Sequence, residues 1–190
     1  MRRLSLAAFS LTLALTSACS SPATVVPPVV DGGDDGVSDD GFLGDPCKAS
    51  VAAGAGANVS VGHGQNFFET LADGATLTWE KGPQGGHHVW VALRMIGLRL
   101  HGTIVQIDLD DVEDPANVRQ VGSSRVIYNF EPDEGGHCVL VGQRAQLDNA
   151  GGVTLPSLLG HHVRITAKLS DPDHAAAADT KTVVVTGALD

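Results

Sequence analysis

The chain has few basic residues. Its 190 residues include 12 lysines and arginines against 22 aspartates and glutamates, for a formal net charge of -10. This balance excludes a nucleic-acid binder, which needs a cationic face to displace counterions from phosphate. The 23 glycines follow no three-residue period, which excludes collagen. Charged residues make up 18% and the mean hydropathy is +0.08, too apolar for a wholly disordered chain. We therefore expect one compact domain with appendages.

Catalytic motifs are also lacking. The sequence contains no Gly-x-Ser-x-Gly elbow, His-Glu-x-x-His zinc helix, phosphate-cradling loop or Gly-x-Gly-x-x-Gly after a strand. A domain of this size leaves little room for a deep pocket once its core is filled. We therefore expect no enzymatic activity and no catalytic residues. A glycosidase-type pair of carboxylates, which would lie far apart in the sequence, stays open as an alternative.

The beginning of the chain has the layout of an export signal. Arg2 and Arg3 precede an apolar run over residues 4–15, and the small residues Thr16-Ser17-Ala18 follow it. The run is too short for a membrane-spanning helix, so the layout predicts a signal peptide over residues 1–18. Leu15-Thr16-Ser17-Ala18-Cys19 resembles the lipobox of bacterial lipoproteins, although Thr16 stands where leucine is usual.

The lipobox resemblance implies that Cys19 is acylated after cleavage and anchors the protein in a membrane. Ser20, in place of an aspartate, implies sorting to the outer membrane of a Gram-negative cell. The side of that membrane on which the protein stands, periplasmic or external, stays open. The alternative is ordinary cleavage near Ala18, which would leave Cys19 as a free thiol.

An acidic segment follows the cysteine. Residues 19–30 carry no charge, whereas residues 31–45 contain six aspartates and no basic residue. Such a segment has too little apolar surface to offset the entropy of ordering it. The sequence therefore predicts a flexible acidic tether over residues 19–54, followed by a folded domain over 55–190. Calcium binding by the aspartates is a weaker alternative, because their spacing lacks the register of a calcium loop.

The remaining cysteines form a natural pair. If Cys19 carries lipid, Cys47 and Cys138 are left in an oxidising compartment, and neither belongs to a Cys-x-x-Cys motif. We expect a disulfide between them that pins the end of the tether to a central strand.

The sequence of the folded part predicts short strands separated by turns rich in Gly, Asp and Pro. Alternation of apolar and polar residues is clearest at 87–95, where Val89, Val91, Leu93 and Met95 share one face, and at 161–169. The predicted strands cover 75–80, 87–95, 103–109, 124–130, 136–143, 161–169 and 181–187. Seven or so antiparallel strands predict an all-β, immunoglobulin-like β-sandwich, although the Trp and Cys positions do not match an antibody domain.

One stretch carries a second resemblance. Gly62-His63-Gly64, Phe68, Leu71-Ala72-Asp73-Gly74 and Gly82-Pro83-Gln84-Gly85-Gly86-His87-His88-Val89-Trp90 resemble a stretch of uncharacterised lipoproteins from Gram-negative bacteria. The resemblance covers about 30 of the 190 residues. It implies an envelope location and a β-domain, and it implies no mechanism.

Histidines are numerous, with eight in a chain that has one tyrosine and two tryptophans. Two predicted strands start with Gly-His-His-Val, at His87-His88 and at His161-His162, and strand parity in an antiparallel sandwich places both pairs at one end. Imidazole is a good ligand for Zn²⁺ and Cu²⁺. These four histidines therefore suggest a metal site, and periplasmic zinc or copper binding is the alternative function. The competing interpretation makes them polar rim residues without a cofactor.

The outer face of the 87–95 strand also presents Trp90 beside Arg94. An exposed aromatic side chain near a cation is typical of a contact for a protein or a glycan. The alternative is that the 62–74 segment covers Trp90. The sequence as a whole predicts a lipid-anchored protein of the outer membrane, whose sandwich is a non-catalytic recognition or structural module.

Overall fold

The computed structural model describes residues 44–49, 56–83, 86–147 and 153–187. All of them belong to one unit, Asp39–Asp190, and the other unit, Met1–Ser38, lies outside them. The predicted signal peptide, Cys19 and most of the predicted tether therefore also lie outside the described residues. In the part of the chain that is described, no helix is long and apolar enough to cross a lipid bilayer.

The strands form two sheets. Sheet A has the order β2-β1-β5-β9-β8, with β4 also paired to β5. Its strands are β1 (Asn58–His63), β2 (Glu69–Thr70), β4 (Glu80–Lys81), β5 (His87–Ile96), β8 (Glu131–Pro132) and β9 (Cys138–Gln146). Sheet B has the order β3-β11-β10-β6-β7. Its strands are β3 (Ala75–Thr78), β6 (Thr103–Asp111), β7 (Arg119–Tyr128), β10 (His162–Ser170) and β11 (Ala176–Thr186). Short helical turns occur at α1 (Pro46–Ala49), η1 (Glu134–Gly136) and η2 (Leu155–Ser157).

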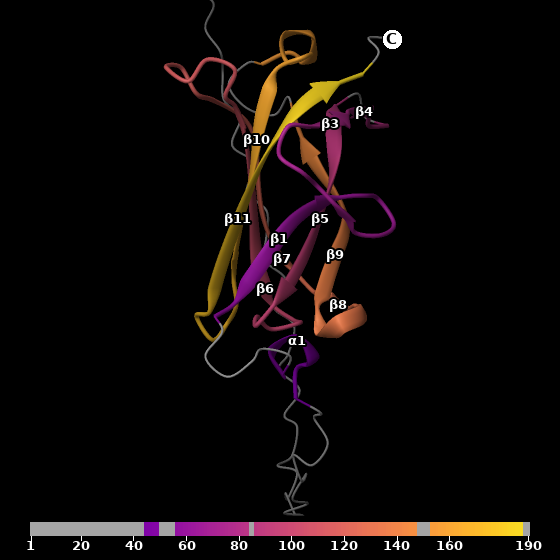
Figure 1. Ribbon diagram of the computed structural model, residues 1–190, viewed down its shortest axis with the longest axis vertical. Helices are drawn as coiled ribbons and strands as arrows, with labels where there is room; N and C mark the ends of the chain where they lie inside the picture. The colour runs from indigo at the N-terminus through magenta and orange to yellow at the C-terminus, as the bar shows by residue number, and fades with distance from the viewer. Residues whose placement is uncertain (1–43, 50–55, 84–85, 148–152, 188–190) are drawn as a thin grey trace, which may run out of the picture. The chain divides into compact units, whose positions relative to one another are not determined.

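This strand order confirms the predicted immunoglobulin-like sandwich. The run β1-β5-β9-β8 corresponds to the A-B-E-D sheet of that fold, and β11-β10-β6 corresponds to its G-F-C sheet, with β7 added beside β6 (Figure 1). Seven of the described strands have six residues or more. The pairing is antiparallel with one exception, because β3 runs parallel to β11.

The predicted alternation places the core residues correctly. Val89, Val91, Leu93 and Met95 of β5 are at most 1% exposed, and alternate residues of β10 from Val163 to Leu169 are buried as well. The outer face of β5 is partly covered too. Phe68 lies against Gly62, which pairs with the buried Ala92, so the connection after β1 folds over this face.

Three predicted ranges differ from the observed strands. The range 75–80 divides at Trp79, where the chain passes from β3 in sheet B to β4 in sheet A. β7 and β11 begin well before the predicted ranges 124–130 and 181–187. β11 starts in an alanine-rich stretch of low strand propensity, and antiparallel pairing with β10 from Ser170↔Ala176 onward extends it. β1 was not among the predicted strands.

The predicted disulfide is confirmed. Cys47 in α1 is bonded to Cys138 at the start of β9, with a Cα–Cα distance of 5.7 Å. Further hydrogen bonds hold α1: the Cys47 carbonyl accepts from the Gly97 amide at 2.7 Å, and the Asp45 carboxylate accepts from the Leu100 amide at 2.7 Å. The packed part of the chain therefore includes α1, which lies within the range predicted as tether.

Candidate functional site

The two histidine pairs lie at the same end of the sandwich, opposite α1 (Figure 1). His87 opens β5, and its carbonyl accepts from the amide of Leu147, just after β9. His162 opens β10, and the His161 carbonyl accepts from the Val185 amide near the end of β11. We call this end, with the four histidines and the β6–β7 loop, the histidine end.

His161 is paired with a carboxylate of sheet B. Its Nδ1 lies 3.2 Å from both carboxylate oxygens of Asp111, the last residue of β6. Arg119 Nη2 donates to the same carboxylate at 2.9 Å, and the Glu113 amide donates to it at 3.2 Å. Burial alone would raise the pKa of Asp111, but these hydrogen bonds outweigh it, so the pKa lies below its ordinary value. Asp111 is therefore the buried centre of this group.

His162 has a carboxylate partner of its own. Its Nδ1 lies 2.7 Å from Oε2 of Glu113, and that oxygen also accepts from the His162 amide at 3.0 Å. The hydrogen bond from His162 lowers the pKa of Glu113. Along the same strand, Arg164 donates to Asp110 at 2.8 Å. Three side chains at the start of β10 are thus bonded to three carboxylates at the end of β6 and the loop after it.

A cavity of about 320 Å³ lies over this cluster. Its lining residues are Asp111, Glu113, Asp114, Asn117, Arg119 and His161. The site predicted from the sequence did not include this loop, which covers residues 112–118 between β6 and β7. The signal that could have linked it to the histidines is its charge, which is opposite to that of the basic residues at the start of β10.

His87 and His88 have different surroundings. The His87 ring packs edge-on against Trp79, with centroids 4.7 Å apart, and the His88 ring packs edge-on against Trp90 at 4.8 Å. His88 is 6% exposed, and its Nε2 has no hydrogen-bond partner in the described structure. Burial, with a smaller effect from Arg144, lowers the pKa of His88. Both histidines line a separate cavity of about 360 Å³ with Gly82, Pro83, Gly86, Arg144 and Gln146.

The structure therefore does not gather the four histidines into one ligand set. Within residues 44–49, 56–83, 86–147 and 153–187, no group of three or more His, Cys, Asp or Glu side chains is arranged to hold a metal ion. Instead, His161 and His162 lie at a half-exposed rim, each within hydrogen-bond distance of a carboxylate.

Trp90 and Arg94 also have separate partners. Arg144 lies over the Trp90 ring, with its Cζ 5.2 Å from the ring centroid, and Arg94 lies over the Phe68 ring at 4.5 Å. Arg94 is further bonded to Asp133 at 2.6 Å. Both predicted contact residues are half-buried. The residue that covers Arg94, Phe68, belongs to the 62–74 segment that was considered as a cover for this face.

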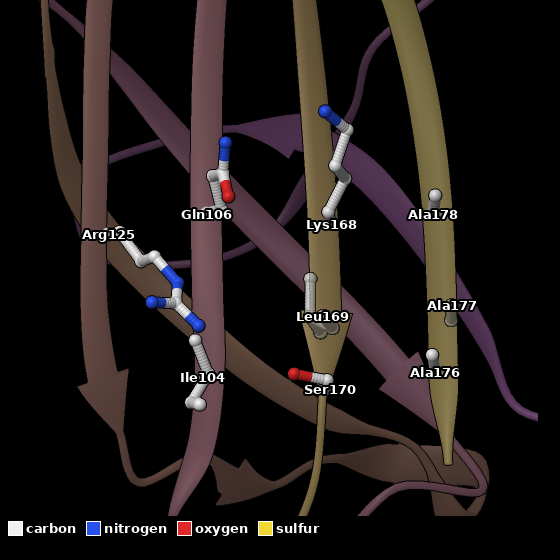
Figure 2. Close-up of a pocket in the computed structure, with 9 residues that line it drawn as sticks. All are labelled: Ile104, Gln106, Arg125, Lys168, Leu169, Ser170, Ala176, Ala177 and Ala178. Carbon is white, nitrogen blue, oxygen red and sulfur yellow. The ribbon is translucent and has the colours of Figure 1, made fainter. Parts of the chain in front are cut away.

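A second surface was not identified from the sequence. The outer face of sheet B is hollowed into a trough of about 470 Å³ across β7, β6, β10 and β11 (Figure 2). Arg125, Ile104, Gln106, Lys168, Ser170 and the alanines of β11 line it. Beside it, β7 forms the edge of the sheet and carries exposed Val126 and Ile127. Exposed apolar side chains on an edge strand indicate a contact surface.

Comparisons with known proteins add little to this description. No protein-family model matches the chain, and no curated protein matches it. Among solved structures, the CooA pilin subunit from enterotoxigenic Escherichia coli is 14% identical, with a TM-score of 0.32, and the match covers 69% of this chain and 99% of that one. Murine CRIg is 10% identical, with a TM-score of 0.31, and the match covers 69% and 98% of the two chains. Likeness at this level carries no functional argument, so the fold assignment rests on the strand order.

Proposed function

We propose that this chain is a lipid-anchored protein of the bacterial cell envelope, held in the outer membrane through Cys19. Its sandwich acts as a non-catalytic module for recognition or structure. The observation that carries the proposal is the position of α1. The described chain begins at one end of the sandwich, and the histidine end lies opposite. A tether that enters at α1 leaves the histidine end free for contacts.

The attachment of α1 supports a tethered module. Besides the disulfide, Lys48 forms ion pairs with Asp171, at 3.2 Å, and with Asp173. Arg99, which follows β5, binds Asp173 at 2.7 Å. The disulfide and these ion pairs would together hold α1 on the sandwich when the tether is pulled.

The histidine end presents charged side chains of both signs, such as Arg119 beside Asp111 and Arg164 beside Asp110. His161 and Asp111 resemble the base and the orienting acid of a catalytic triad, but the cavity above them is lined by no serine, threonine or cysteine among the described residues. Mixed charges at a rim are suited to contacts with a protein or a glycan.

Acylation at Cys19 provides the direct test. The full-length chain would be expressed in a Gram-negative host fed an alkyne fatty acid, and label and outer-membrane fractionation would be measured. We expect labelling of the wild type and of Thr16→Leu, which restores the usual lipobox residue, and no labelling of Cys19→Ser. A processed but unlabelled wild type would contradict the anchor.

The alternative function, zinc or copper binding, has a separate test. Two of the four histidines are each bonded to a carboxylate, so tight binding by all four would require these pairs to open. Calorimetric titration of the mature protein with Zn²⁺ and Cu²⁺ would support the metal function if binding were submicromolar and lost in His87→Ala and His161→Ala together.

A further inference from the structure

β7 is an open sheet edge. It is the last strand in the order of sheet B, and no described strand pairs with its other side. An edge strand presents free N–H and C=O groups to another extended chain, and proteins commonly block such edges with Pro or Lys. The sequence of β7, RQVGSSRVIY, contains neither residue. Over residues 124–128, no proline, lysine or bulge of β7 opposes the addition of another strand.

The exposed apolar side chains of the domain gather on this strand. Of the four exposed large hydrophobic side chains among the described residues, three are on β7 or directly before it: Val118, Val126 and Ile127, with exposures of 48%, 46% and 66%. Val126 pairs with Val105, whose side chain is 1% exposed in the core. Val126 thus faces the interior side of sheet B and is still exposed, because sheet A ends on this side in β8, which has only two residues.

The exposed part of the β7 edge ends at Gly122. At Gly122 the strand approaches sheet A so closely that a Cβ atom would lie 2.0 Å from the carbonyl oxygen of Gln146. The neighbouring residue, Val121, is the extra residue of a bulge between β6 and β7 and is fully buried. The two sheets are therefore in close contact at this point, and the open edge considered below covers residues 124–128.

The charge of β7 determines which kind of segment can bind to its edge. The charged residues of β7 are Arg119 and Arg125, and no acidic residue belongs to the strand. Arg119 is paired with Asp111, whereas Arg125 has no ion pair with any described residue and extends across β6 toward Ile104 (Figure 2). A second copy of β7 would bring the same arginines and no carboxylate. A strand with acidic side chains among apolar ones would neutralise Arg125 and cover Val126 and Ile127.

We infer that the edge of β7 over residues 124–128 binds an extended acidic and apolar segment of a partner protein, which pairs with it as an additional strand of sheet B. Backbone hydrogen bonds would supply much of the affinity. The side chains of Arg125, Val126 and Ile127 would supply the preference for acidic and apolar side chains in the bound segment. This inference rests on the recognition role proposed above and is independent of the anchor at Cys19.

Synthetic peptides provide the test. A fluorescent nine-residue peptide that alternates valine with glutamate would be titrated into the full chain. The matched control is the same peptide with lysine in place of each glutamate. We expect at least tenfold weaker binding of the lysine peptide. Two further peptides would carry N-methyl groups on the amides of one edge or of the other. Strand addition requires one of them to bind and the other to fail, since only one edge of the peptide faces β7.

Variants of the protein locate the site. Arg125→Glu should reverse the preference between the two peptides, and Ile127→Ser, which removes apolar surface without adding a charge, should weaken both. Lys81→Glu makes the same charge change on an exposed strand of sheet A and should leave binding unchanged. Circular dichroism would establish that each variant is folded.

Three results would overturn the inference. They are no binding of the glutamate peptide at millimolar concentration, equal binding of both N-methylated peptides, and an unchanged preference in Arg125→Glu. A dimer in sedimentation that Ile127→Ser dissolves would assign the edge to a second copy instead. Repeating the titration with Cys19→Ser separates this site from the anchor, because failure of acylation leaves peptide binding intact.

Discussion

His161 and Asp111 are 50 residues apart in the chain, yet the imidazole Nδ1 lies 3.2 Å from both oxygens of the carboxylate. The pair joins the beginning of β10 to the end of β6, at the end of the sandwich opposite the disulfide. Asp111 also accepts from Arg119, so one nearly buried carboxylate holds together the edge strand β7 and the loop before β10.

Replacement of Asp111 by alanine should therefore destabilise the domain by about 2 kcal/mol, because it leaves His161 and Arg119 without their shared acceptor. Urea unfolding would measure the change in the free energy of unfolding. Asp114→Ala is the matched control. Its carboxylate bonds only within the exposed loop, to Ala116 and Asn117, so we expect a much smaller effect. Equal losses in the two variants would contradict the central position of Asp111.

Acid should weaken the attachment of α1. Hydrogen bonds from Arg99 and Lys48 lower the pKa of Asp173 to about 2, from 3.8 for the free group. Because the folded-state pKa is the lower one, this carboxylate stabilises the fold above pH 4, and the contribution is lost as the pH falls toward 2. Asp173→Asn should therefore unfold more easily than the wild type at pH 6 and equally easily at pH 2. A difference that persists at pH 2 would show another cause.

The disulfide should make a large contribution to stability. It closes a loop of 91 residues, for which chain entropy gives roughly 4.6 kcal/mol. Reduction should lower the free energy of unfolding by this amount, and the double variant Cys47→Ser, Cys138→Ser should match the reduced wild type. The double variant should not respond to added reductant. If it does respond, the loss measured in the wild type has another source.

His88 should make the domain sensitive to mild acid. Burial, followed by the charge of Arg144, lowers the pKa of His88 below 6.5, so the fold favours the neutral ring. Stability from this site is therefore complete above pH 6.5 and is lost as the pH falls through the folded-state pKa. His88→Gln should reduce the loss of stability between pH 7.5 and 5.5. His101→Gln, an exposed replacement of the same kind, should leave the loss unchanged.

Much of the fold follows from local patterns. Alternation at Val89 to Met95 and at Val163 to Leu169 identified the core faces of β5 and β10, because burial on one side of a sheet imposes a period of two. The early residues of β11 gave no such signal, since alanines become a strand there through pairing with β10. The candidate sites were predicted less well. The histidines were identified, but their partners Asp111 and Glu113 depend on which loops the topology brings together.

The sequence by itself determined the all-β class, the pairing of Cys47 with Cys138 and the core side of the main strands. The class and the core faces depend on composition and on a period of two residues, and the pairing depends on the number of cysteines. Only the tertiary structure decided that His161 and His162 bond to carboxylates, that Arg94 lies over Phe68, and that β7 is an edge with exposed Val126 and Ile127. The order of strands in a sheet joins residues far apart in the chain, and it arises from burying both sheets at once rather than from any single segment.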